Sequence, residues 1–256
     1  MTRDHDLLDY LLRLADSDLV LAQRLGAWIG HGPVLEEDIA SANVGLDLLG
    51  QARLWFAYAG EVEARFAKRG RSEDELAFLR ESSQYRNVLL VEQPNGDYAH
   101  TMTRQFFFDA FHELLLDILS RSRDACIAEI AAKGAKEVRY HVERSSGWVI
   151  RLGDGTDESR RRMQAACDAL WMYAGEMFEP DETGHALAVE GIGCDAQALA
   201  PAWRERVGGV MAEATLTVPV SDWAQTGSKR GVHTEHLSRL LAEMQVLPRT
   251  FAGAQW

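Results

Sequence analysis

The chain has 256 residues, 46% hydrophobic and 26% charged, the balance of a globular protein that can bury a sizeable core. Its net charge is −12, which argues against non-specific nucleic-acid binding and docking on anionic membranes. No apolar run approaches the ~18 residues that a membrane-spanning helix needs.

The start of the chain and the cysteines favour a cytoplasmic protein. The first twelve residues interrupt their leucines with acids, which is unlike a secretory signal peptide. Cys126, Cys167 and Cys194 are widely spaced and odd in number. They fit neither a disulfide framework nor a Cys-x-x-Cys metal site.

Apolar residues recur every three or four positions in the first half of the chain, which predicts long helices. The first covers about residues 7–29 and stops at Gly30–Pro33, and the second continues from there for about 30 residues. Ser72 and Glu75 form a capping box that begins a short helix. The apolar run Val88–Val91 is either a short buried strand or extended packing before a Pro-Asn-Gly turn.

The second half of the chain repeats the helical pattern. Further helices are predicted over about 98–122, over 127–152, from Thr156 onward, over 196–215 and from His233 to Gln245. The four long helices, taken as two hairpins joined by a long crossover, are the pattern of a ferritin-like four-helix bundle. Without repeats or a convincing linker, we predict one all-α domain over residues 1–256, with additional C-terminal helices.

The stretch Gln105–Leu119 is apolar on nearly every side, as in a helix at the centre of a domain. It nevertheless contains Asp109, His112 and Glu113 at helical spacings. Such side chains are costly to bury unless they pair with one another, with a metal or with neighbouring helices. A di-iron carboxylate bundle takes one Glu from each of two helices and Glu-x-x-His from each of the other two. We therefore compared the four long helices with that pattern.

The first two long helices lack most of these ligands. The first contains no Glu, and its nearest substitutes are Asp16 and Asp18. The second contains no His, and Gly50 stands three residues after Asp47, where an imidazole is required. The pattern therefore fails in half of the bundle.

The other two helices depart from the pattern less. Asp109 or Glu113 has the chemistry of a single carboxylate ligand. After Glu137, Tyr140 takes the third place and His141 the fourth, a spacing that still shares one helix face. We interpret the following residues as vestigial core positions of a metal-free site: Asp16, Asp47, Asp109, His112, Glu113, Glu137, Tyr140 and His141.

In that interpretation Asp109 with His112, and Glu137 with His141, form local pairs inside a polar core, and the chain has no catalytic, cofactor or metal residues of its own. The alternative is a self-sufficient di-metal oxidase or hydroxylase. Its candidate ligands are Asp16 or Asp18, Asp47, Asp109, Glu113, Glu137 and His141.

Other motifs indicate structure rather than chemistry. His233 and His236 are three residues apart but lack a distal acid, so we expect an exposed helix start there. Asp181–His185 has the pattern of a turn and helix start. Neither a phosphate-binding glycine loop nor a nucleophile elbow is present. The scattered tryptophans are expected to anchor the core and interfaces.

Several long segments resemble a known family. They include Gly45–Arg53, Asn87–Gly96, Lys136–His141, Thr215–Pro219 and Gly231–Leu237. Together with shorter matches they cover nearly the whole chain in order and resemble the PaaC family, the non-catalytic helical subunits of bacterial phenylacetyl-CoA 1,2-epoxidases. The resemblance implies a ferritin-like fold and a structural role without a cofactor in this chain.

The resemblance also implies partners. A homologous catalytic subunit is expected to hold a di-iron centre and, with O₂ and electrons from a flavin and iron–sulfur reductase, to epoxidise the ring of phenylacetyl-CoA during aerobic phenylacetate degradation. A small bridging subunit is expected to complete the assembly, and a related aryl-CoA thioester stays open as the substrate. Because obligate interfaces are rich in aromatics, we expect the contact face on the second helix, at Trp55, Phe56, Tyr58 and Phe66.

Overall fold

The computed structural model describes residues 3–221, 223–251 and 253–254. The chain divides into two compact units, of which unit 1 combines residues 1–93 with 227–256 and unit 2 is Pro94–Thr226. The described residues form helices, turns and loops, without a strand. The all-α class is therefore confirmed, and the arrangement as one domain with one four-helix bundle stays a prediction.

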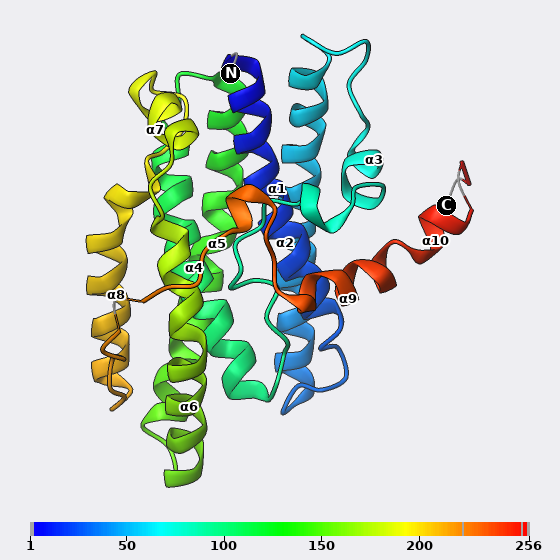
Figure 1. The fold of residues 1–256 in the computed structure, drawn as a ribbon. Helices are drawn as coiled ribbons and strands as arrows, with labels where there is room; N and C mark the ends of the chain where they lie inside the picture. Colours follow the sequence, from blue (N-terminus) through cyan, green and yellow to red (C-terminus); the bar gives the residue numbers. More distant parts are fainter. Residues whose placement is uncertain (1–2, 222, 252, 255–256) are drawn as a thin grey trace. The chain divides into compact units, whose positions relative to one another are not determined.

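Unit 1 is built on a helical hairpin of α1 (Arg3–Gly26) and α2 (Leu35–Glu63), the dark blue and light blue helices of Figure 1. Asp38 fixes the turn between them, because its carboxylate accepts hydrogen bonds from the backbone N–H groups of Gly30 (2.9 Å) and Gly32 (3.1 Å). Gly30 has φ +88°, and a Cβ at Gly32 would lie 2.9 Å from the Asp38 Cβ. The turn therefore requires both glycines.

Shorter elements complete unit 1. Ser72 and Glu75 form the predicted capping box at the start of the first of them. The apolar run Val88–Val91 is a turn rather than a strand, with Leu89, Leu90 and Val91 buried. The elements are α3 (Glu73–Phe78), η1 (Ser82–Gln84), η4 (Ser228–Arg230), α9 (Glu235–Met244) and α10 (Val246–Thr250).

Unit 2 is organised around α4 (Tyr98–Leu119), which packs against α5 (Ala125–Gly153), α6 (Asp157–Ala174) and α8 (Ala200–Glu213). The side chains of Asp97, Asp124 and Thr156 cap the first three of these helices. Each cap satisfies N–H groups that a helix start leaves without partners. The remaining elements are η2 (Gly175–Phe178), α7 (Glu182–Val189) and η3 (Ala196–Leu199).

The aromatic side chains of α4 form the core of unit 2. The Phe107 ring lies edge-on to Trp171 and Trp203, with ring centroids 5.7 Å away in each case. The Trp203 indole N–H also donates to the Phe107 carbonyl oxygen at 2.9 Å, so its polar edge is satisfied inside the core. The predicted central position of this stretch is confirmed for unit 2.

The predicted contact face is wrong for Trp55, Phe56 and Tyr58, whereas Phe66, which follows α2, is 39% exposed and stays a prediction. Trp55, Phe56 and Tyr58 are only 0%, 2% and 5% exposed, so they belong to the core. The sequence did not show which side of α2 is covered, because its apolar residues occur on nearly every side. None of the described helices is long and apolar enough to cross a membrane.

Candidate functional site

The first candidate position, Asp16 of α1, is held in unit 1 by an arginine. Asp16 is fully buried, and its carboxylate accepts hydrogen bonds from both terminal nitrogens of Arg80 and from the Arg86 backbone N–H at 2.8 Å. Both carboxylate oxygens are thus engaged by the protein. This fork-shaped contact is the geometry in which a guanidinium binds a carboxylate most strongly.

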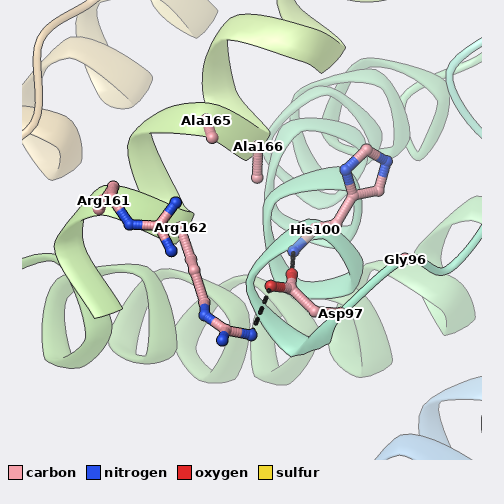
Figure 2. Close-up of a pocket in the computed structure, with 7 residues that line it drawn as sticks. All are labelled: Gly96, Asp97, His100, Arg161, Arg162, Ala165 and Ala166. Carbon is pink, nitrogen blue, oxygen red and sulfur yellow. Dashed lines mark hydrogen bonds and ion pairs between the residues drawn. The ribbon is translucent and has the colours of Figure 1, made fainter. Parts of the chain in front are cut away.

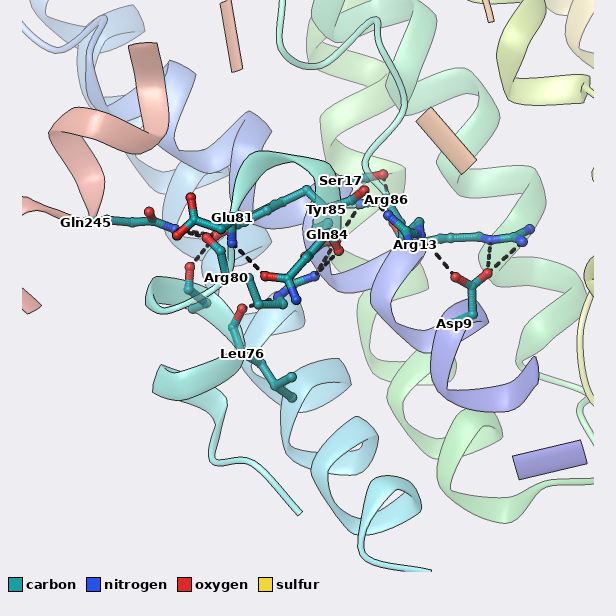
Figure 3. Close-up of polar contacts among 12 residues, drawn as sticks. Asp9, Arg13, Ser17, Leu76, Arg80, Glu81, Gln84, Tyr85, Arg86 and Gln245 are labelled. Atoms are coloured by element: carbon teal, nitrogen blue, oxygen red, sulfur yellow. Dashed lines mark hydrogen bonds and ion pairs between the residues drawn. The ribbon is translucent and has the colours of Figure 1, made fainter. Parts of the chain in front are cut away.

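Arg80 makes further contacts besides the one with Asp16 (Figure 3). It also donates to the carbonyl oxygens of Leu76 (2.5 Å) and Gln84 (2.9 Å). The Tyr85 ring centroid lies 4.3 Å from the guanidinium carbon, within range of a cation–π contact. From the C-terminal part of unit 1, Gln245 donates to the Arg80 carbonyl oxygen at 3.0 Å. The pair therefore joins segments that are distant in sequence.

The other candidates in unit 1 differ in burial. Asp18 is 1% exposed, so both candidate aspartates of α1, Asp16 and Asp18, lie inside. Asp47 and Gly50 of α2 are half-buried. A Cβ at Gly50 would meet no atom within 4 Å, so no contact within the chain requires glycine there.

A second buried carboxylate, Asp109 of α4, lies in unit 2. It accepts hydrogen bonds from the Gln105 side-chain amide at 2.7 Å and from the Ser145 hydroxyl of α5 at 2.8 Å. Burial raises the pKa of Asp109 to about 6, although the His141 charge and the two hydrogen bonds favour the ionised form. Asp109 is thus a buried acid held by neutral donors.

Two histidines lie in the same part of unit 2. His112 is 3% exposed and His141 is 1% exposed. Burial lowers the pKa of His112 to about 3, and the charge of His141 acts in the same direction. The His112 ring also packs on Phe108, with centroids 5.1 Å apart. His112 is therefore neutral at physiological pH.

The remaining candidates in unit 2 are Glu113, Glu137 and Tyr140. The Glu113 carboxylate accepts a hydrogen bond from Arg206 of α8. Glu137 is half-buried. Tyr140 is 49% exposed while His141 is buried, because one step along a helix turns the side chain by about 100°. The prediction that Tyr140 is a core position is therefore wrong.

Three of the candidate acids already have hydrogen-bonding partners within their own unit. The Asp16 carboxylate accepts hydrogen bonds from Arg80, the Asp109 carboxylate from neutral donors, and the Glu113 carboxylate from Arg206. Across the described part of the chain, no group of three His, Cys, Asp or Glu side chains is arranged to hold a metal ion. The chemistry that the contacts support is charge pairing and hydrogen bonding within each unit.

A further polar cluster in unit 1 was not foreseen. The two ring nitrogens of His233 lie 3.0 Å from Glu92 Oε2 and 3.0 Å from the Tyr85 carbonyl oxygen. Both oxygens accept, so both ring nitrogens carry protons and His233 is an imidazolium. The expected exposed helix start is wrong for His233, whose side chain is 4% exposed.

Two other groups donate hydrogen bonds to the Glu92 carboxylate. Its carboxylate accepts from the Thr234 backbone N–H at 2.7 Å and from the Asn87 amide at 3.1 Å. Burial acts to lower the pKa of His233, but the hydrogen bond to Glu92 and the Glu92 charge outweigh it, so the pKa is raised. No motif links Glu92 to His233, which lies 141 residues away.

A pocket of about 380 Å³ lies at the start of α4 in unit 2 (Figure 2). Arg162 pairs with Asp97 at 3.4 Å across it, and both Arg161 and Arg162 pair with Glu158. These carboxylates offset the positive charge of the arginines. The pocket is lined by Gly96, Asp97, His100, Arg161, Arg162, Ala165 and Ala166.

Comparisons with known proteins identify the family of the chain. Residues 1–256 match the family described as phenylacetic acid catabolic protein. The chain is also 51% identical over 252 residues to one of the subunits of the 1,2-phenylacetyl-CoA epoxidase of Escherichia coli strain K12, a match that covers 98% of this chain and 100% of that protein. The chain therefore belongs to the phenylacetic acid catabolic protein family.

Proposed function

We propose that the chain is the structural subunit of a bacterial phenylacetyl-CoA epoxidase in the cytoplasm. Its 51% identity to a subunit of the Escherichia coli epoxidase extends over the full length of that relative, which supports the same place in a related complex. The chemistry is assigned to a homologous catalytic subunit that holds the di-iron centre. A small bridging subunit and a flavin and iron–sulfur reductase complete the assembly.

The contact between Asp16 and Arg80 carries the structural assignment. A buried carboxylate that binds a guanidinium through both oxygens must lose a charged partner before it can bind a metal. Removing one partner of a buried ion pair leaves the other charge uncompensated, at a cost of about 3–5 kcal/mol. The paired state of Asp16 thus opposes metal binding at the α1 position.

A structural subunit acts by fixing the geometry of its partner. Reactive groups must be held within about 0.5 Å of productive positions by rigid surroundings. The packed aromatic core of unit 2 and the buried ion pairs of unit 1 supply that rigidity. We assign no cofactor, nucleic acid or membrane to this chain.

Turnover measurements test the proposal. Purified catalytic subunit and reductase would be assayed for phenylacetyl-CoA epoxidation with and without this chain, and the chain would be assayed with the reductase alone. We expect turnover only when the chain and the catalytic subunit are combined. Turnover by the chain alone would instead support a self-sufficient di-metal oxidase. Replacing the substrate with other aryl-CoA thioesters tests its identity.

A further inference from the structure

One face of α2 carries large aliphatic side chains in contact with solvent. Leu35, Ile39 and Leu46 are 70%, 52% and 65% exposed. Their spacings of four and seven residues place them on one side of the helix. With the half-buried Ala42 and Leu49, they follow the alternating spacing of four and three residues typical of a seam between two packed helices. We call these five residues the α2 seam.

The opposite side of α2 is already packed. Val44, Leu48 and Ala52 are at most 1% exposed, and α2 packs against α1 and α3 in unit 1. A helix that is hydrophobic on nearly every side is typical of full burial. The apolar composition of the seam therefore predicts a packing partner, but the seam is exposed to solvent.

Two features suit the seam to a second helix. Gly50 follows Leu49, and the space above its Cα is open, so another backbone has room to approach closely. At the start of the seam, the Asp38 carboxylate fixes the preceding turn through Gly30 and Gly32. The seam is thus presented by a rigid element, which lowers the entropic cost of binding.

The charges beside the seam distinguish between partners. Glu36, Asp47 and Glu61 lie along one edge of α2 at spacings of 11 and 14 residues, close to whole numbers of turns. In a symmetric contact between two copies, the same patch faces itself, so these acids would meet acids. A partner with basic residues beside an apolar helix would complement the edge.

We propose that the α2 seam docks an apolar helix of the catalytic subunit, bordered by Lys or Arg. This inference rests on the proposed function and adds the surface that carries it. Stable interfaces use roughly 20–30 residues on each side. The seam would therefore form the core of a larger footprint, with Glu36 and Glu61 at its rim.

The test uses the full-length chain and its catalytic subunit, with the dissociation constant measured by titration and the complex followed by size-exclusion chromatography. The variant is Leu46→Glu, which places a charge in the centre of the seam. Val220→Glu is the matched control, because Val220 is a fully exposed aliphatic residue in unit 2. Circular dichroism checks that both variants stay folded.

We expect Leu46→Glu to weaken the complex roughly 30-fold or more, as for residues at the centre of an interface, and Val220→Glu to leave the affinity within about threefold. Unchanged affinity for Leu46→Glu would overturn the inference, as would equal losses for both variants. If the wild-type chain does not bind the catalytic subunit, the proposed function itself fails.

Two further measurements distinguish binding of the catalytic subunit from binding of a second copy of the chain. Glu36→Lys should slow association severalfold, and added salt should slow the wild type, because the proposed border of the partner is basic. A wild-type homodimer that Leu46→Glu dissolves would assign the seam to a second copy and contradict the proposal.

Discussion

The two units stabilise their buried acids in different ways. In unit 1, Asp16 is bound by Arg80 and Glu92 by His233, so each carboxylate faces a cation. In unit 2, Asp109 is bound by the amide of Gln105 and the hydroxyl of Ser145. Buried acids with different partners should therefore differ in how strongly the free energy of unfolding depends on pH. They should also differ in how much stability is lost when one partner is removed.

The largest expected effect is at Arg80. Arg80→Met should lower the free energy of unfolding by about 3–5 kcal/mol, because it leaves the Asp16 charge buried without its cation. Urea unfolding at pH 7.5 measures the change. Replacing both residues, as Asp16→Leu with Arg80→Met, should recover more than half of the loss. Equal instability of the single and double variants would contradict a role for charge compensation.

The stabilisation that the pair of Glu92 and His233 contributes should depend on pH. Because the pKa of His233 is raised in the folded state, its contribution is fully present below the unfolded value near 6.5 and is lost as pH rises through the folded pKa. His233→Gln should therefore cost about 1.5–3 kcal/mol at pH 6 and progressively less towards pH 9.

Chemical unfolding at both pH values, with His185→Gln as the control, checks this prediction. His185 is exposed, and its ring lies 3.3 Å from Asp195. A loss for His233→Gln that is the same at pH 6 and pH 9 would show that the imidazolium does not stabilise the fold.

Asp109 should show the same sign, with stability lost as pH rises, and a smaller effect at lower pH. Its folded pKa of about 6 exceeds the ordinary value of 3.8, so the folded state binds more protons and stability falls as pH rises between these values. The stability of the wild type relative to Asp109→Asn should fall by about 1–1.5 kcal/mol between pH 5 and 7.5.

Unfolding measurements at the two pH values give this difference directly. Asp117→Asn, an exposed substitution on the same helix, is the control. If the difference between the wild type and Asp109→Asn does not change with pH, Asp109 is not a protonated acid at pH 5.

Much of the local structure was readable from the sequence. The 3.6-residue period predicted α2, α4 and α5, and the capping box at Ser72 predicted α3. The first helix starts earlier than predicted, at Arg3, and ends at Gly26. The predicted helix over 196–215 is divided into η3 and α8. Periodicity defines such ends poorly because caps and turns decide them.

The polar contacts were less predictable. Arg80 lies 64 residues from Asp16, in an irregular segment, and Ser145 lies 36 residues from Asp109. Helical spacing reveals pairs on one helix but not partners that tertiary packing brings from elsewhere. For the same reason, composition alone placed Trp55 on a contact face, whereas it lies in the core.

The proposed structural role requires that the protein's own side chains, and not a metal, satisfy the buried acids of the two units. Its most direct test is the iron content of the purified full-length chain after anaerobic incubation with ferrous iron and desalting. We predict far less than one iron per chain, with no change for Asp109→Asn. Close to two irons per chain, lost in Asp109→Asn, would contradict that role.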